Sequence, residues 1–152
     1  MIRNLAGIVV GYLAMAIFMF ITFSILYSVL GADGSFDPSS FHVSSNWIVF
    51  SIILSFLAAM DGGWVCMLIS KNRNSVLILA GLVLAIGIIS SIPKMNEASD
   101  IKDKPRIGKV SNTEAMQNAV QPNFVLILNP ILGAIGIFTG SKLKKENKPQ
   151  GV

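Results

Sequence analysis

Asp61 is the ionisable residue with the most unusual position in this chain. It is the single charged residue within the apolar stretches 8–30, 47–69, 76–92 and 124–139, and the rise of an α-helix places it roughly 13 Å from the nearer end of its stretch. A carboxyl group at that depth should face protein or water, because burying its charge in hydrocarbon costs about 3 kcal/mol or more. Two roles remain open: a relay for protons or cations, and a polar strut that hydrogen-bonds a neighbouring helix.

Asn129, in the last apolar stretch, is the expected partner of Asp61. The same counting places the two side chains at depths that differ by roughly 5 Å, which helix tilt and side-chain length can bridge. Pro130 has no amide hydrogen and frees the backbone carbonyl of Leu126, an acceptor for either side chain. Polar groups of two helices are thus expected to meet at one level of the membrane.

Other reactive side chains are scarce. The chain contains one histidine, His42, and one cysteine, Cys66, so a disulfide, a Cys-x-x-Cys redox pair and a histidine-rich metal site are excluded within one chain. Asp33, Asp37 and His42 lie within ten residues and have suitable groups for a cation site, but such loop residues are more often simply solvated. No catalytic residues, no metal and no cofactor are therefore expected.

The elements that position Asp61 follow from the distribution of charge. Only 13% of the 152 residues are charged, about half the roughly 25% of an ordinary soluble domain. A soluble enzyme, a nucleic-acid-binding domain and a disordered chain are poor interpretations of this composition, despite the net charge of +4. The pattern predicts an all-α polytopic membrane protein, a bundle of four transmembrane helices within a single membrane domain. The expected spans are residues 8–30, 47–69, 76–92 and 124–143.

Lysine and arginine near the ends of the spans predict the orientation. Residues 31–46 contain neither, whereas residues 70–75 contain two and the tail 144–152 contains three. Because cytosolic loops are enriched in these residues, both termini and residues 70–75 are expected in the cytosol. Residues 31–46 and 93–122 then form the outer loops, although the second of them carries five basic residues.

Small residues recur on the spans at intervals of three or four. Gly62 belongs to such a seam on the second span, and Gly133, Gly136 and Gly140 form one on the last span. Helices in lipid associate by close packing, so these glycines are expected at helix–helix contacts and Trp64, about 200° from Gly62, away from them. The seams are compatible with a tight monomer and with a homo-oligomer.

The two outer loops carry different local signals. Ser111 and Glu114 have the spacing of a capping box, which predicts a short helix after Ser111, with a partly disordered connector as the alternative. The first loop contains Phe36 and Phe41 and is followed by Trp47. Because aromatic side chains favour the headgroup region, this loop is expected to lie against the membrane surface.

Three segments carry a family resemblance. Residues Ala58–Val65 (AAMDGGWV), Ile69–Lys71 (ISK) and Leu79–Leu84 (LAGLVL) resemble small bacterial four-span integral membrane proteins. Members of this set typically have a Gly-Gly-aromatic turn in the second helix, a basic inner loop and a third span rich in small residues. The resemblance extends over most of the chain and implies a multi-pass inner-membrane protein, but it implies no activity.

The expected function is a structural or accessory subunit of the membrane. The alternative is a proton-coupled transporter of a small solute, acting as an oligomer around Asp61. The expected surroundings are the lipid bilayer and either a second copy of the chain or another membrane protein, without nucleic acid.

Overall fold

The structure of the protein is a computed structural model, and it describes residues 1–96, 105–108 and 110–143. The predicted basic tail 144–152 and part of the second outer loop lie outside these residues. Four of the helices are long and apolar enough to cross a membrane, so the predicted all-α four-span class is confirmed. The helices, in chain order, are α1 (Ile2–Ser35), α2 (Ser45–Ser70), α3 (Arg73–Met95), α5 (Asn112–Asn118) and α6 (Asn123–Lys142).

Three of the four long helices extend past the predicted spans at both ends. An apolar stretch marks the part of a helix that lies in hydrocarbon, whereas the helix itself ends where its backbone groups find other partners. Ser44 accepts a hydrogen bond from the Trp47 amide at 3.2 Å and begins α2. Lys71, in the left-handed conformation, ends α2. In α1 the helix is interrupted at Gly31, whose φ of 64° marks a kink just beyond the first apolar stretch.

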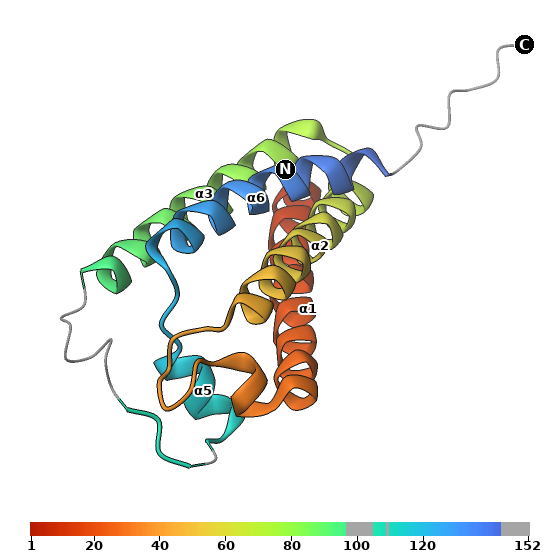
Figure 1. Cartoon of the computed structure of the whole chain (residues 1–152). Coiled ribbons are helices and arrows are strands. Elements are labelled where there is room, and N and C mark those ends of the chain that lie inside the picture. Colours follow the sequence, from red (N-terminus) through yellow and green to blue (C-terminus); the bar gives the residue numbers. More distant parts are fainter. Residues whose placement is uncertain (97–104, 109, 144–152) are drawn as a thin grey trace, which may run out of the picture.

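The long helices pack in the order α1, α2, α6, α3. Figure 1 shows α3 and α6 side by side as one pair, which crosses the pair formed by α1 and α2 obliquely. The N-terminus, the turn between α2 and α3 and the last turn of α6 lie at one end, and α5 lies at the other. The central helix of the packing order is therefore α2, which contacts α1 on one side and α6 on another.

Small side chains fill much of the core between the long helices. Alanine and glycine at these positions let the helix backbones approach closely, which is the main source of attraction between helices in lipid. The buried members of this core come from all four long helices. They are Met15, Ala58, Ala59, Cys66, Val76, Leu79, Ala80 and Ile137.

A cap closes the end of the molecule that carries α5; it comprises residues 36–44, 105–108 and 110–120. Its two segments are joined through the backbone: the Val43 amide donates to the Val120 carbonyl at 3.1 Å, and the Arg106 amide donates to the Ser39 carbonyl at 3.0 Å. Ser111 caps α5 by accepting from the Glu114 amide at 3.2 Å. The predicted short helix after Ser111 is therefore formed.

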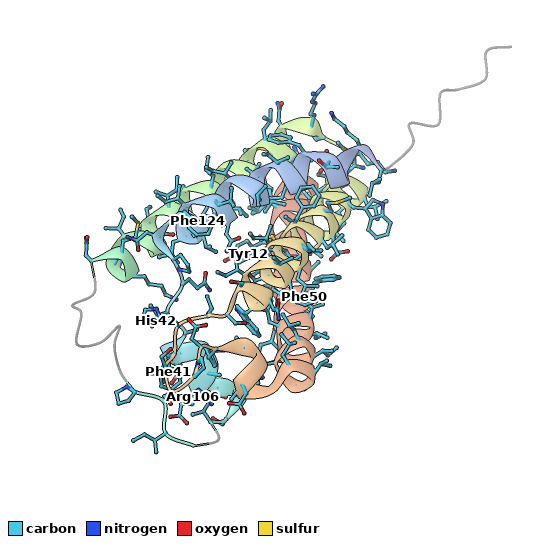
Figure 2. The ribbon with its side chains drawn as sticks, in the orientation of Figure 1. Tyr12, Phe41, His42, Phe50, Arg106 and Phe124 are labelled. Atoms are coloured by element: carbon cyan, nitrogen blue, oxygen red, sulfur yellow. The ribbon has the colours of Figure 1, made fainter. Side chains whose placement is uncertain are left out.

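The aromatic residues of the first loop form a second core inside the cap. Phe36 and Phe41 are only 3% and 2% exposed, and they pack on Tyr27 of α1, Trp47 of α2 and Ala115 of α5. Figure 2 shows Phe41 within the cap. The rings are covered by protein because α5 and the returning chain pack over the first loop, while the position of this loop at the membrane surface stays a prediction.

Candidate functional site

Asp61 lies on a side of α2 that faces away from α6. Its neighbour Gly62 contacts α1 and the next residue, Gly63, contacts α6. Asp61 itself is half-buried. At about 100° per residue, Leu57, Trp64 and Leu68 lie on the same side of the helix and are exposed, whereas Ala58, also one turn away, is buried. We name this surface the Asp61 face and define it as Leu57, Asp61, Trp64 and Leu68, of which the three apolar residues are between 37% and 43% exposed.

Asn129 lies elsewhere in the bundle. Because Gly136 of α6 packs against Ala59 of α2, Asn129 is about two helical turns, or roughly 11 Å, further toward the cap than the level of Ala59. The Oδ1 atom of Asn129 is buried and accepts no hydrogen bond from the described residues. Nor do the described residues include a hydrogen-bond partner for the side chain of Asp61, so the structure does not bring these two polar groups together.

Ser91 satisfies the carbonyl that Pro130 frees. The Ser91 hydroxyl lies 2.8 Å from the Leu126 carbonyl oxygen of α6 and 2.7 Å from the Gly87 carbonyl oxygen of its own helix. The hydroxyl is thus positioned to donate to both acceptors within the α3/α6 interface. A serine of α3, rather than Asp61 or Asn129, is the partner of this carbonyl.

The glycines expected in helix packing lie in close contacts. A Cβ atom on Gly62 would lie 2.8 Å from the carbonyl oxygen of Gly11, and one on Gly136 would lie 2.8 Å from Cβ of Ala59. On Gly140 it would overlap the Met60 backbone, and on Gly133 it would lie 3.2 Å from a methyl group of Val83. Gly62 therefore serves the α1/α2 contact, Gly136 and Gly140 the α2/α6 contact, and Gly133 the α3/α6 contact.

Other glycines also lie in close contacts between helices, and of these Gly63 was not part of a predicted seam. Gly63 packs against the backbone of Ile137, and the Pro130 ring packs against Gly87, where a Cβ atom would lie 2.6 Å from Cγ of the proline. Gly7 packs against Ser70 of α2. The spacing of small residues was the available signal, but it does not say which of two adjacent glycines faces which neighbour.

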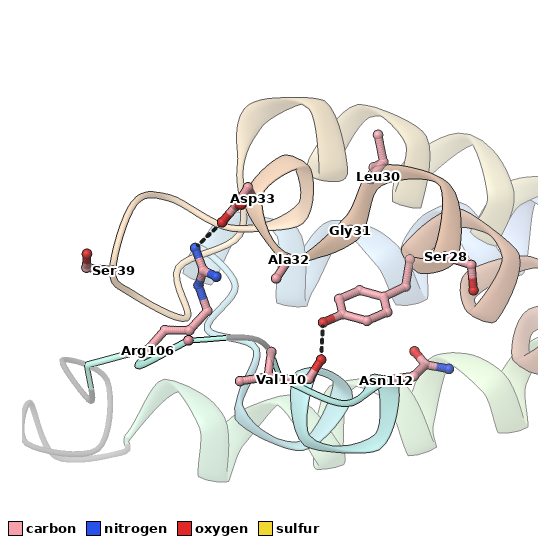
Figure 3. A pocket seen from close by; sticks show the side chains of 11 residues that line it. Ser28, Leu30, Gly31, Ala32, Asp33, Ser39, Arg106, Val110 and Asn112 are labelled. Carbon is pink, nitrogen blue, oxygen red and sulfur yellow. Dashed lines mark hydrogen bonds and ion pairs between the residues drawn. The ribbon is translucent and has the colours of Figure 1, made fainter.

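A polar cavity of about 820 Å³ lies in the cap, beside the kink in α1. Its walls come from the last turns of α1 and from the chain that precedes α5 (Figure 3). The Tyr27 hydroxyl donates to the Val110 carbonyl at 2.9 Å and holds the two walls together. The other lining residues are Ser28, Leu30, Gly31, Ala32, Asp33, Ser39, Arg106, Gly108 and Asn112.

Arg106 is the one cation among the described residues that line this cavity. Its side chain is only 8% exposed, and Nη2 donates to Oδ1 of Asp33 at 2.9 Å, whereas the Asp33 side chain is 95% exposed. The Nε atom of Arg106 and the Oδ1 atom of Asn112 are buried without a hydrogen-bond partner among the described residues. The cavity therefore contains a guanidinium with unused donor capacity, since one hydrogen bond engages one of its five N–H groups.

The remaining candidate residues do not assemble into a reactive centre. Cys66 is buried in the contact between α1 and α2, close to Gly7 and Gly11. In the part of the chain that the structure describes, no three acidic, histidine or cysteine side chains are grouped to hold a metal ion. Of the three residues considered for a cation site, Asp33 instead pairs with Arg106.

The chain is a multi-pass integral membrane protein. No protein-family model matches its sequence, and no curated protein and no solved structure matches it either. Inferences about its more specific role therefore rest on two features of the structure itself, the Asp61 face and the cavity beside Arg106.

The sequence held little sign of the cavity. Arg106 is one of five basic residues in a long loop and has no motif around it. Asp33 lies 73 residues earlier, and only the folding of the cap brings the two together. Hydropathy and spacing describe neighbours along the chain, whereas this pair depends on contact between two loops.

Proposed function

We propose that this chain is a non-enzymatic accessory subunit that binds a spanning helix of another membrane protein through the Asp61 face. The observation that carries the proposal is the position of the half-buried Asp61, within a spanning helix and beside three exposed apolar residues that the other helices of the chain leave uncovered. An intramembrane carboxyl group normally faces protein or water because its exposure to lipid is costly. A partner helix would supply that environment.

The charge of Asp61 favours a partner with a lysine or arginine at the same depth. The apolar stretches 8–30, 47–69, 76–92 and 124–139 contain no basic residue, so a compensating charge at the depth of Asp61 has to come from outside the chain. A second copy of the chain would add another carboxyl group and no cation. An opposite charge within a few ångströms stabilises the ionised carboxylate, and the low dielectric of the membrane strengthens the pairing.

The apolar members of the Asp61 face suit a helix packed alongside α2. Leu57, Trp64 and Leu68 are spaced by seven and four residues and flank Asp61 on both sides. A helix lying along this row would bury three large side chains, and aromatic and leucine side chains supply most of the contact area in such interfaces. The ion pair would select the partner and the register.

In the proposed orientation both termini and the turn between α2 and α3 are cytosolic, and the cap lies outside the cell membrane. The exposed basic residues Arg3, Lys71 and Arg73 gather at the cytosolic end in this arrangement. Arg106, which belongs to the basic loop that opposes this orientation, is paired with Asp33 and thus contributes little net charge. The positive-inside rule counts lysine and arginine rather than net charge, so the support for this orientation comes from the basic residues at the cytosolic end and from their absence in residues 31–46.

Photo-cross-linking in native membranes tests the proposal. A photoreactive amino acid at position 64, on the Asp61 face, should form an adduct with a second membrane protein that has a basic residue in a spanning helix. The matched control is position 89 on α3, where Ile89 is also exposed. Asp61→Leu should remove the adduct at position 64, and Asp61→Glu should retain it because the charge is kept.

Three results would contradict the accessory role. An adduct with twice the mass of the chain would show that a second copy covers the face. An adduct that persists unchanged in Asp61→Leu would show that the carboxyl group does not select the partner. Proton-linked solute uptake by the purified chain alone in proteoliposomes, lost in Asp61→Asn although the protein folds, would favour the transporter.

A further inference from the structure

The cavity in the cap opens beside the part of α1 where the membrane-spanning stretch ends. Tyr27, Ser28 and Leu30 line it from the last turn before the kink, and Arg106 and Asn112 line it from the opposite wall. A cavity of about 820 Å³ is large enough for a small polar molecule or for the headgroup of a lipid. Its position places polar groups of the protein next to the apolar surface of a spanning helix.

Arg106 provides the recognition group for an anion. The side chain is more than nine-tenths buried, and its guanidinium makes one hydrogen bond with the described residues, to Asp33. Arginine presents planar pairs of N–H donors that match the oxygens of a phosphate. Because the Asp33 side chain is almost fully exposed, water can take over its hydrogen bonds when an anion binds the guanidinium.

The balance of charge in the cavity favours a zwitterion over a simple anion. Arg106 and Asp33 are the charged groups among the described lining residues, and together they are neutral. The α1 segment that ends at the kink also directs the negative end of its helix dipole toward this region. A ligand with a phosphate beside an ammonium group would place each charge next to an opposite one.

The surface of α1 below the cavity indicates that such a ligand comes from a lipid. Ile21 and Ile25 lie on the same side of α1 as Ser28, and both are more than half exposed. Asn112 donates to the Ser24 hydroxyl at 3.1 Å, so the rim of the cavity joins this side of the helix directly. Acyl chains attached to a headgroup in the cavity would lie along the exposed isoleucines.

We propose that the cavity binds the headgroup of a phosphatidylethanolamine-type lipid, with the phosphate on Arg106 and the ammonium group near Asp33. This site is separate from the Asp61 face, which lies on α2 at mid-membrane depth. It gives the cap a function in anchoring or sensing the lipid leaflet at that end of the protein. A soluble zwitterion such as O-phosphoethanolamine has the same chemistry without acyl chains.

Lipid retention measured by native mass spectrometry tests the site. The protein is reconstituted in nanodiscs that contain equal amounts of lipids with phosphoethanolamine, phosphocholine and phosphoglycerol headgroups, and the lipids that stay bound on release are counted. The wild type should retain the phosphoethanolamine lipid preferentially, because a quaternary ammonium donates no N–H hydrogen bond and phosphoglycerol has no ammonium. Arg106→Gln should reduce that retention about 10-fold or more, the usual effect of losing a charged hydrogen bond.

Two variants separate a binding role from a structural one. Arg73→Gln removes a basic residue that is exposed at the opposite end and should leave retention unchanged. Asp33→Asn keeps Arg106 and removes the expected partner of the ammonium group, so the preference should move from phosphoethanolamine toward phosphoglycerol. A role of the ion pair in stability alone would not change the order of preference among headgroups.

The outcomes are distinguishable. Equal retention of the three lipids by the wild type, or wild-type retention by Arg106→Gln, would overturn the site. An unchanged preference in Asp33→Asn would overturn the assignment of the ammonium to that side of the cavity. Saturable binding of O-phosphoethanolamine in detergent, without preferential retention of the lipid, would overturn the lipid as its source.

Discussion

Replacing Gly63 by alanine should destabilise the packing of α2 against α6. A Cβ atom at this position would lie 2.7 Å from both Cα and the carbonyl carbon of Ile137. Ordinary van der Waals contact begins at 3.4 Å, and the carbonyl oxygen of Ile137 would be closer still than these two carbon atoms, so the two backbones would have to separate by more than about 0.7 Å at this point. The contacting atoms belong to the main chain of α6, and no change of side-chain rotamer can relieve the overlap.

The expected magnitude comes from two opposing effects. Alanine raises helix propensity over glycine by about 1 kcal/mol, and overpacking a tight core costs about 1 to 3 kcal/mol. A gap of 0.5 to 1 Å also loses roughly a quarter to a half of the dispersion energy of the neighbouring contacts. Because the overlap is with main-chain atoms, the upper end of the overpacking cost applies, and the free energy of unfolding of Gly63→Ala should fall by about 2 kcal/mol.

Gly81→Ala provides the matched control. Gly81 also lies inside a spanning helix, but a Cβ atom there would meet no other atom within 4 Å. Gly81→Ala should leave the protein as stable as the wild type or slightly more stable. Reversible unfolding in mixed micelles, followed by circular dichroism, measures both variants. Equal stability of the two would refute the close contact between Gly63 and α6.

Three further predictions concern other parts of the chain. Ser91→Ala should leave the carbonyl freed in α6 unsatisfied and lower the free energy of unfolding by about 1 kcal/mol, whereas Ser90→Ala, at an exposed position of the same helix, should not. Ser111→Ala should remove the N-cap of α5 and weaken this helix by about 1 kcal/mol, seen as faster amide hydrogen exchange in α5 with unchanged exchange in α2. In a cysteine-free background, an impermeant thiol reagent added outside cells should label a cysteine at Ser39 and not one at Asn74; the reverse pattern would invert the proposed orientation.

The spans could be predicted from composition, whereas the neighbours of their polar residues could not. Long apolar stretches require helices in lipid because each backbone group must find a partner within its own segment. That requirement acts along the chain and so can be read from it. The partner of the Leu126 carbonyl is Ser91, 35 residues away, and its identity depends on α3 packing beside α6.

In the cap, too, the local features could be predicted from the sequence, whereas the long-range contacts could not. The Ser111 cap and the helix that follows it depend on contacts within four residues, and the sequence contained a signal for them. Phe36 and Phe41 were expected in the headgroup region because their residue type favours it. They are buried because α5 folds back over the first loop, a contact between segments about 75 residues apart.

The sequence by itself determined the membrane class, the four spans, the small-residue seams and the presence of an unpaired carboxyl group in the second span. These properties depend on residue type and on spacing along one helix. Only the tertiary structure decided that the half-buried Asp61 lies beside an exposed apolar row of α2, that Asn129 lies about two turns away from its level, and that Arg106 meets Asp33 beside a cavity. The physical reason is that the rotation of one helix against another is set by which close contacts its glycines permit. These contacts involve both helices, so the rotation cannot be predicted from the sequence of one helix alone.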